Sequence, residues 1–326
     1  KKFTELFNTP VRKEDSEIQQ IHFDIGASAQ SVLEECILLM VNHIHAETKQ
    51  ENLCLGGGVA LNGVANARIL KEGPFKNIFI PPSPGDAGSA IGCALYGYYS
   101  FLKNKRVIEN NPKKMIQNNV YLGPEYSNDY IKSFLDSSNI SYTEYTQDDL
   151  LKITAKLISE QNVIGWYQGR MEWGPRALGN RSILADPRSQ NMKDILNEKI
   201  KHRESFRPFA PSILEEHASD YFELDIPSPY MLLVVKVRKP DILPAITHVD
   251  GTGRLQTVSK ESNPLYYDLI NEFYKLTNVP VLINTSMNVR GEPIVNTPSQ
   301  AYEMLNKTDM DYLVIGNYVI SKEVKP

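Results

Sequence analysis

The sequence predicts an α/β protein of two domains, because short apolar strand-like runs alternate with helical patterns. NLCL at 52–55 leads into three glycines and a helical pattern through about Leu70, and NIFI at 77–80 leads into PPSPGDAGSA and the helical stretch AIGCALYGYYSFL. Strand, glycine turn and helix, twice over, are typical of α/β construction. The chain has 326 residues, which exceeds what one compact core usually holds.

The elements follow in order along the chain. A helix is expected over 28–48, where Val32, Cys36, Met40 and Ile44 recur at helical spacing. The polar, proline-interrupted segment that follows the first part predicts a linker at 106–118, between a first domain at 1–105 and a second at 119–326. In the second domain, helices are expected in DDLLKITAKLISEQ, MKDILNEKI and PSQAYEML, and strands in VIGWY, VPVLI and DYLVIG.

Composition excludes several classes of protein. The net charge is −4, which gives no support for a nucleic-acid-binding protein, and no run of about 20 apolar residues predicts a membrane span. The polar first residues are no secretory signal, and without an initiator methionine we expect a piece of a longer protein. The cysteines Cys36, Cys54 and Cys93 are far apart in apolar surroundings, so we expect buried thiols in a cytoplasmic protein.

A basic island interrupts this acidic chain. Residues 165–213 hold nine Lys or Arg and five Asp or Glu, a net of +4. This local excess favours a small anionic ligand, and the alternative is a set of solvated arginines with salt-bridge partners. The prolines Pro175 and Pro208 stiffen the backbone beside Arg176 and Arg207. The donors suited to phosphate are Arg170, Arg176, Arg181, Lys201, Arg203 and Arg207.

Two glycine-containing loops of the first domain are further candidates. In LGGGVALNGVAN, Gly57 and Gly58 would let the backbone approach a nucleotide and Asn62 would hydrogen-bond it, or the segment is only a tight turn. In PPSPGDAGSAIG, Asp86 is either a metal ligand at the carboxyl edge of a sheet or a helix N-cap.

Polar residues of the second domain complete the candidates. LINTSMNVRGEPIV presents Asn284, Thr285, Ser286 and Asn288 in succession, either to grip phosphate oxygens or as a polar hairpin turn. His248, in the turn-rich THVDGTGRLQTV, is a candidate ligand contact. No Ser-His-Asp order and no carboxylate pair is readable in the sequence.

In order, NLCLGGGVALNGVANARIL, PPSPGDAGSAIG, GRMEWGPRALGNRSILADPR, KIKHRESFRPFAPS, HVDGTGRLQTV and LINTSMNVRGEPIV resemble the motifs of the NodU/CmcH-type O-carbamoyltransferases. This family includes tobramycin, cephem and nodulation-factor carbamoyltransferases. The resemblance extends from about residue 20 to residue 320.

The resemblance implies a two-site enzyme. A YrdC-like second domain, α+β in class, would form carbamoyl-adenylate from ATP, Mg²⁺ and carbamoyl phosphate. Its Lys-x-Arg and Ser-x-Asn pairs correspond to Lys201 and Arg203 and to Ser286 and Asn288, with catalytic roles. The first domain would be the second lobe of an actin-like transfer domain, which passes the carbamoyl group to a hydroxyl of a small-molecule or glycan acceptor. Members of such families often pair, so a homodimer is an open expectation.

The chain departs from this family at the transfer site. Asp86 matches an aspartate that holds Fe²⁺ or another divalent metal, but the accompanying H-x-x-x-H and the first actin-like lobe are absent. We therefore expect adenylation, but not transfer, from this chain alone. Two rivals remain, namely an ATP-dependent kinase on the actin-like fold and a nucleotide-binding regulatory module.

Overall fold

The computed structural model describes residues 2–13, 16–106 and 120–322. The chain divides into two compact units, one made of Lys1–Cys54 and Val64–Phe79 and the other of Leu55–Gly63 and Ile80–Pro326. The predicted linker at 106–118 lies outside the described residues except for Arg106, so the domain boundary there stays a prediction. The described contacts group 80–106 with the second unit.

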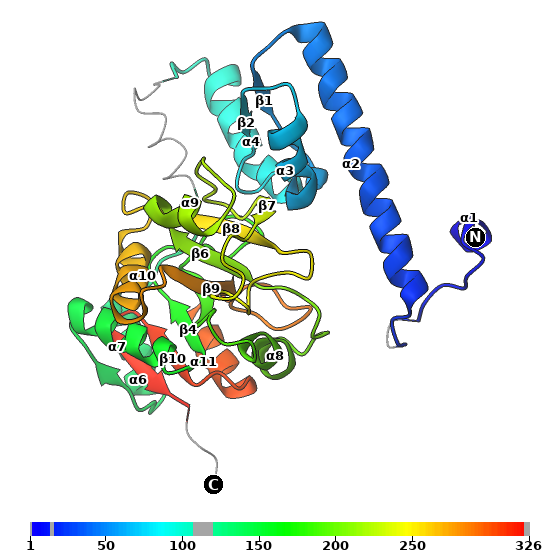
Figure 1. Cartoon of the computed structure of the whole chain (residues 1–326). Helices are drawn as coiled ribbons and strands as arrows, with labels where there is room; N and C mark the ends of the chain where they lie inside the picture. The colour runs from blue at the N-terminus through cyan, green and yellow to red at the C-terminus, as the bar shows by residue number, and fades with distance from the viewer. Residues whose placement is uncertain (1, 14–15, 107–119, 323–326) are drawn as a thin grey trace. The chain divides into compact units, whose positions relative to one another are not determined.

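The first unit is built on one long helix and a two-stranded parallel sheet (Figure 1). Its elements are α1 Lys2–Leu6, α2 Gln20–Thr48, β1 Asn52–Cys54, α3 Gly63–Glu72 and β2 Asn77–Phe79. The predicted helix at 28–48 and both predicted strands are confirmed. Arg68 of α3 joins the helices, because its guanidinium donates to Glu34 of α2 at 3.1 Å and to Glu72 at 2.8 Å.

The face of α2 that the sequence spacing singled out is exposed. Val32, Met40 and Ile44 keep 59%, 62% and 41% of their side chains accessible. The cysteines at 36, 54 and 93 are also exposed, so the expectation of buried thiols is wrong. The helix forms as predicted, but α2 turns a neighbouring face inward, where Val41 is buried and Leu33 and Ile37 are half-buried, and so leaves the predicted face exposed.

The described residues of the second unit form a mixed sheet of nine strands in the order β3-β11-β10-β4-β5-β9-β6-β8-β7. Its parallel pairs are β10 with β4 and β6 with β8, and the other neighbours run antiparallel. The strands are β3 Thr143–Glu144, β4 Ile164–Tyr167, β5 Arg181–Ala185, β6 Ala210–Leu214, β7 Leu233–Lys236, β8 Thr252–Val258, β9 Val281–Ser286, β10 Tyr312–Ile315 and β11 Tyr318–Ser321.

Helices cover this sheet, and α7 packs directly against α10 (Figure 1). The α-helices are α4 Ser89–Leu95, α6 Asn128–Ser137, α7 Gln147–Ser159, α8 Met192–Ile195, α9 Ala218–Tyr221, α10 Pro264–Thr277 and α11 Pro298–Lys307. The shorter turns are the 3-10 helices η1 Gly58–Leu61, η2 Asp86–Gly88 and η5 Glu215–His217 and the π turns η3 Tyr96–Phe101 and η4 Leu196–Ile200.

Local sequence explains where these helices begin. Thr146 caps α7 by accepting from the N–H of Asp149 at 3.3 Å, and two aspartates occupy its first turn. Thr297 and Gln300 form a capping box at the start of α11, which also carries a proline in its first turn.

These helices and strands confirm the α/β class predicted from the sequence. Within the described ranges, no helix combines the length and apolarity needed to cross a bilayer.

Gly179, just before β5, is held in a conformation that only glycine tolerates. Its φ is +108°, and a Cβ placed there would overlap the buried ring of Tyr266. We expect Gly179→Ala to lower the free energy of unfolding by about 3 kcal/mol or more, measured by urea denaturation.

Gly291 provides the matched control for Gly179. Its φ is +83°, but nothing lies within 4 Å of the position that a Cβ would take, so Gly291→Ala carries the backbone strain without the overlap. We expect a loss of about 1 kcal/mol there. Equal losses in the two variants would contradict the packing argument.

A candidate anion-binding site

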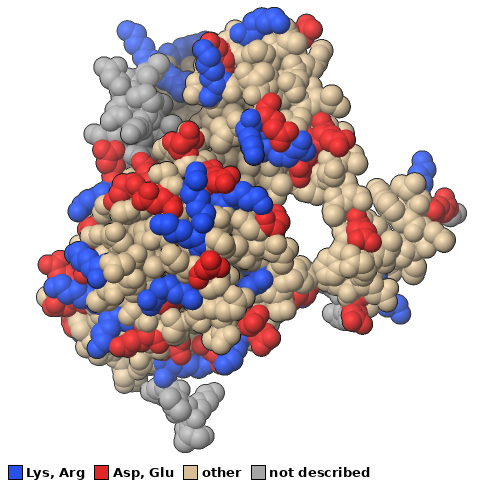
Figure 2. Space-filling model, viewed as in Figure 1, with Lys and Arg blue, Asp and Glu red and all other residues tan. Residues whose placement is uncertain are grey.

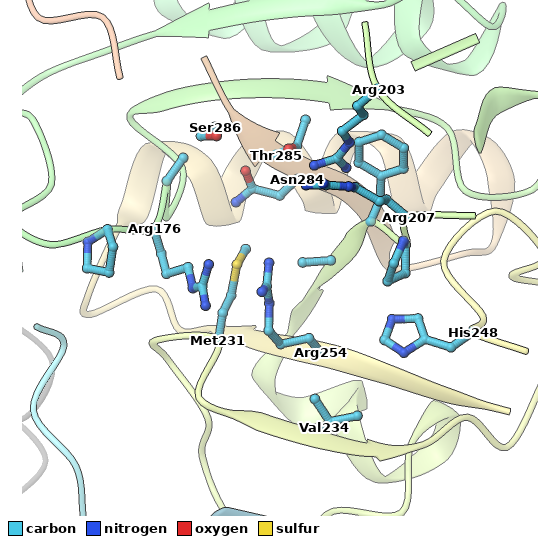
Figure 3. A pocket seen from close by; sticks show the side chains of 15 residues that line it. Arg176, Arg203, Arg207, Met231, Val234, His248, Arg254, Asn284, Thr285 and Ser286 are labelled. Atoms are coloured by element: carbon cyan, nitrogen blue, oxygen red, sulfur yellow. The ribbon is translucent and has the colours of Figure 1, made fainter. Parts of the chain in front are cut away.

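A cavity of about 380 Å³ opens among the strands β6, β7, β8 and β9 and the loops that precede β5 and β6 (Figure 3). It brings together residues that are more than 100 positions apart in the sequence. The residues that line it are Pro175, Arg176, Ala177, Arg203, Arg207, Pro208, Phe209, Ala210, Met231, Val234, His248, Arg254, Asn284, Thr285 and Ser286.

Four arginines and no carboxylate occur among these described lining residues. Burial, followed by the charges of Arg176 and Arg203, lowers the pKa of Arg254 to about 9. Burial and the charge of Arg207 lower the pKa of Arg203 to about 10, although Glu204 opposes them. The Nε atoms of Arg176 and Arg254 are buried and have no hydrogen-bond partner in the described chain. Mutually repelling cations with free donors form an arrangement that an anion would stabilise.

The position of Arg203 is fixed by the segment in front of it. Asn197, in the π turn η4, accepts from Arg203 Nε at 2.8 Å and donates to the carbonyls of Ser205 and Arg207 at 3.1 and 2.9 Å. The Arg203 guanidinium also lies 4.8 Å from the centre of the Phe209 ring. These contacts hold the side of the guanidinium that faces the protein.

The loop that carries Arg176 is organised by a buried carboxylate. Glu172 is 4% exposed, and its Oε1 accepts from the N–H groups of Leu178 at 2.7 Å, Asn180 at 2.7 Å and Arg181 at 3.2 Å. Three main-chain donors on one oxygen hold the turn between β4 and β5 in a single conformation. Arg176 is therefore presented to the cavity from a rigid loop.

Lys201 lies behind the end of β9. Its ammonium donates to the carbonyl of Ser286, to the carbonyl of Asn288 at 2.8 Å and to Asn288 Oδ1 at 3.0 Å. Ser286 Oγ donates to the same Oδ1 at 2.6 Å. Burial, followed by the charge of Arg203, lowers the pKa of Lys201 to about 7. Lys201 therefore fixes the Ser286–Asn288 segment, while Ser286 itself lines the cavity.

Asn284 is oriented by a fully buried chain of hydrogen bonds. Gln256 donates to the carbonyl of Leu178 at 3.0 Å, so its oxygen remains free to accept. The amide of Asn284 donates to that oxygen at 2.9 Å and to Ser212 Oγ at 3.1 Å. Asn284 Oδ1 is left as a buried acceptor without a partner in the described chain.

The structure does not bring Arg170 and Arg181 to the cavity. Arg170 is exposed and donates to the carbonyl of Leu122 at 3.2 Å. Arg181 is fully buried, lies 3.6 Å from the centre of the Tyr167 ring and donates to the carbonyls of Gln168, Gly169, Asn180 and Pro124. Pairing of Arg181 with Tyr167 at the start of β5 turns this arginine into the protein, where it ties loops together.

The candidate residues of the glycine loops are not among the residues that line the cavity. Gly57 adopts a φ of +95° and donates to the carbonyl of Pro84 at 2.7 Å, and Gly58 begins η1, which ends before Asn62. A 3-10 turn therefore separates the glycines from α3. Asp86 begins η2, and no group of three His, Cys, Asp or Glu among the described residues is arranged to hold a metal ion.

No local pattern in the sequence marks Arg254 or Glu172 as a residue of the site. Arg254 stands in GTGRLQTV, and only the sheet reveals that β8 lies beside β6 at the cavity. Glu172 stands at the centre of GRMEWGPR, where an acidic residue amid arginines is typical of an ordinary salt-bridge partner. Its actual partners are main-chain N–H groups, which composition does not disclose.

The charge on the visible face is mixed. Figure 2 shows Lys and Arg interspersed with Asp and Glu over the visible face. Acidic residues thus stand among the basic ones on this face, whereas the described residues that line the cavity include four arginines and no carboxylate.

The second unit is thus a mixed α/β sheet with an arginine-lined cavity. The sequence matches the family description "Carbamoyltransferase C-terminus" over residues 155–322 and "Carbamoyltransferase N-terminus" over residues 1–95. The chain thus belongs to the carbamoyltransferase family. The first match contains every residue that lines the cavity.

The relatives that the chain resembles are longer than the chain itself. An uncharacterised protein of Synechocystis is 49% identical over 100% of this chain and 56% of its own length, and the nodulation protein NolO of Bradyrhizobium diazoefficiens is 43% identical over 97% and 58%. The chain thus spans a little over half of these curated relatives. A solved structure of full-length HypF in the phosphate- and nucleotide-bound form has 19% identity and a TM-score of 0.39, covering 57% of this chain and 23% of HypF.

Proposed function

We propose that the arginine-lined cavity binds ATP and carbamoyl phosphate and forms carbamoyl-adenylate. The observation that carries the proposal is the convergence of Arg176, Arg203 and Arg254 in a cavity that has no carboxylate among its described lining residues. The Nε atoms of Arg176 and Arg254 have no partner in the described chain. ATP and carbamoyl phosphate are both anions and repel each other. A cluster of arginines offsets this repulsion and lets them approach. In this proposal the second domain is YrdC-like.

The proposed reaction has two balanced steps. Water first cleaves carbamoyl phosphate to carbamate and inorganic phosphate. A carbamate oxygen then attacks the α-phosphorus of ATP, the bond to the β-phosphate breaks, and pyrophosphate leaves with the electron pair. Arg203 and Arg254 would neutralise the phosphates, and Ser286 and Thr285, at the end of β9, would hold a phosphate oxygen or the carbamoyl group in line.

Magnesium would accompany ATP, since phosphate oxygens and water are its usual ligands. No carboxylate is present among the described residues that line the cavity, so these residues offer the ion no carboxylate ligand. Fe²⁺ or another divalent metal at Asp86 would need further ligands, because Asp86 has no cluster of described ligands around it.

We further propose that the glycine loops contribute to a transfer site in the longer protein. Gly57, Gly58 and Asn62 would bind nucleotide or carbamoyl-adenylate there, as the second lobe of an actin-like domain. The acceptor would be a hydroxyl of a small molecule or a glycan, in an ATP-dependent O-carbamoyl transfer that we place in the cytoplasm.

The test is exchange of labelled pyrophosphate into ATP by this chain with magnesium. We expect exchange only when carbamoyl phosphate is present, and loss of exchange in Arg254→Ala by about 100-fold or more. Arg12 offers the control, because Arg12→Ala removes an arginine of the first unit that does not line the cavity.

The rival hypotheses give different products. Release of ADP with phosphorylation of an acceptor would support the kinase hypothesis, and nucleotide binding without turnover would support a regulatory module. Exchange that does not depend on carbamoyl phosphate would overturn the proposed substrate pair.

A further inference from the structure

The imidazole of His248 lines the cavity and has one nitrogen that is committed to its own loop. Nδ1 lies 3.1 Å from Thr252 Oγ1, and this hydroxyl also lies 2.6 Å from Asp250 Oδ1. The carboxylate of Asp250 can only accept, so the single hydroxyl hydrogen goes to Asp250. Thr252 Oγ1 then accepts from His248, which places a hydrogen on Nδ1.

The other nitrogen is left as an acceptor. The pKa of His248 is lowered to about 4, mainly by burial. The charge of Asp250 opposes this shift, and the charges of Arg254 and Lys193 add to it. The ring is therefore neutral near pH 7, and Nε2 carries a lone pair. Nε2 is buried and has no partner in the described chain. Figure 3 shows the ring extending from its loop into the group of cavity side chains.

The neighbours of His248 determine which ligand donor this nitrogen meets. Arginine side chains only donate, so they bind the phosphate of a ligand and cannot bind its N–H groups. Arg254 lies close enough to His248 for its charge to affect the imidazole. In carbamoyl phosphate the amide nitrogen is three bonds from phosphorus, so a phosphate held by Arg254 brings the NH₂ group into the same neighbourhood.

We propose that His248 Nε2 accepts a hydrogen bond from the NH₂ group of carbamoyl phosphate and makes the cavity selective for it. The proposal rests on the proposed function, because it requires that the cavity take carbamoyl phosphate. Acetyl phosphate has the same shape but carries a methyl group in place of NH₂. It would leave Nε2 buried and unpaired, so we expect it to bind about 10- to 100-fold more weakly.

The test compares the dissociation constants of carbamoyl phosphate and acetyl phosphate by calorimetric titration of the full chain. His248→Ala is expected to weaken the binding of carbamoyl phosphate about 10-fold and to leave the binding of acetyl phosphate unchanged. His248→Gln retains an acceptor oxygen and is expected to restore part of the preference. Thr252→Val removes the partner that keeps the hydrogen on Nδ1, so part of the preference is lost although the imidazole remains.

His217 provides the control, because His217→Ala alters a histidine that contacts Tyr274 outside the cavity and is expected to change neither constant. Circular dichroism checks that every variant folds. The selectivity proposal is overturned if His248→Ala weakens the binding of both acyl phosphates equally, or weakens the binding of ATP alone. Pyrophosphate exchange would still support the proposed function in that case. A folded wild type that neither binds carbamoyl phosphate nor exchanges pyrophosphate would overturn both.

Discussion

Lys201→Met is expected to reduce carbamoyl-phosphate-dependent pyrophosphate exchange by about 100- to 1,000-fold. The ammonium of Lys201 holds the carbonyls of Ser286 and Asn288 and the side-chain oxygen of Asn288. Methionine fills the same space without donating, so the segment that ends β9 loses its anchor and Ser286 loses its fixed position in the cavity. Lys199→Met is the matched control, because the side chain of Lys199 is exposed two positions earlier.

The pH dependence separates this positioning role from a merely structural one. Because the pKa of Lys201 lies near 7, the amine loses its charge as the pH rises through 7. We expect the affinity for triphosphate to fall from pH 6 to pH 8 beyond the change seen in Lys201→Met. An identical pH profile in the wild type and in Lys201→Met would contradict a role for this charge.

Stability should respond to pH in the opposite direction. The pKa of Lys201 is lowered on folding from an ordinary value of 10.5. Between about pH 7 and pH 10.5 the unfolded chain therefore binds more protons at this residue, so its contribution to the free energy of unfolding rises with pH. Lys201→Met removes this slope, which denaturant titrations at several pH values would measure.

The elements of the fold could be predicted from the sequence because their patterns are local. Hydrophobic spacing predicted α2, helical stretches of sequence predicted α7 and α11, and short apolar runs predicted β4, β9 and β10. Burial could not be predicted in the same way. Val32 and Met40 have the spacing of a buried helix face, but exposure depends on which elements cover that face.

The sequence predicted which residues gather at the site better than it predicted what each of them does there. Arg176, Arg203 and Arg207 do converge on one cavity, but Arg181 is turned into the protein by the register of β5 against β4. Lys201 was expected to bind phosphate, and its donors are used by main-chain carbonyls instead. Strand register and main-chain acceptors are long-range features that no local motif contains.

Glu172→Ala is expected to lower the free energy of unfolding by about 3 kcal/mol or more, because three buried N–H groups lose the carboxylate oxygen that accepts from them. The same change should abolish pyrophosphate exchange, since the loop that presents Arg176 depends on those bonds. Urea denaturation and the exchange assay measure the two effects.

Glu172→Gln tests the effect of the loop's geometry on the cavity in a chain that remains folded. The amide oxygen still accepts from Leu178 and Asn180, but it carries no charge, so we expect a loss of about 1–2 kcal/mol in a chain that remains folded. Anion affinity should then fall through the altered placement of Arg176. The exposed Glu125 is the control, with an expected change within about 0.5 kcal/mol for Glu125→Ala. Full exchange activity in a folded Glu172→Ala variant would mean that the loop holds its shape without the carboxylate, and that the arginine cluster is positioned by the sheet alone.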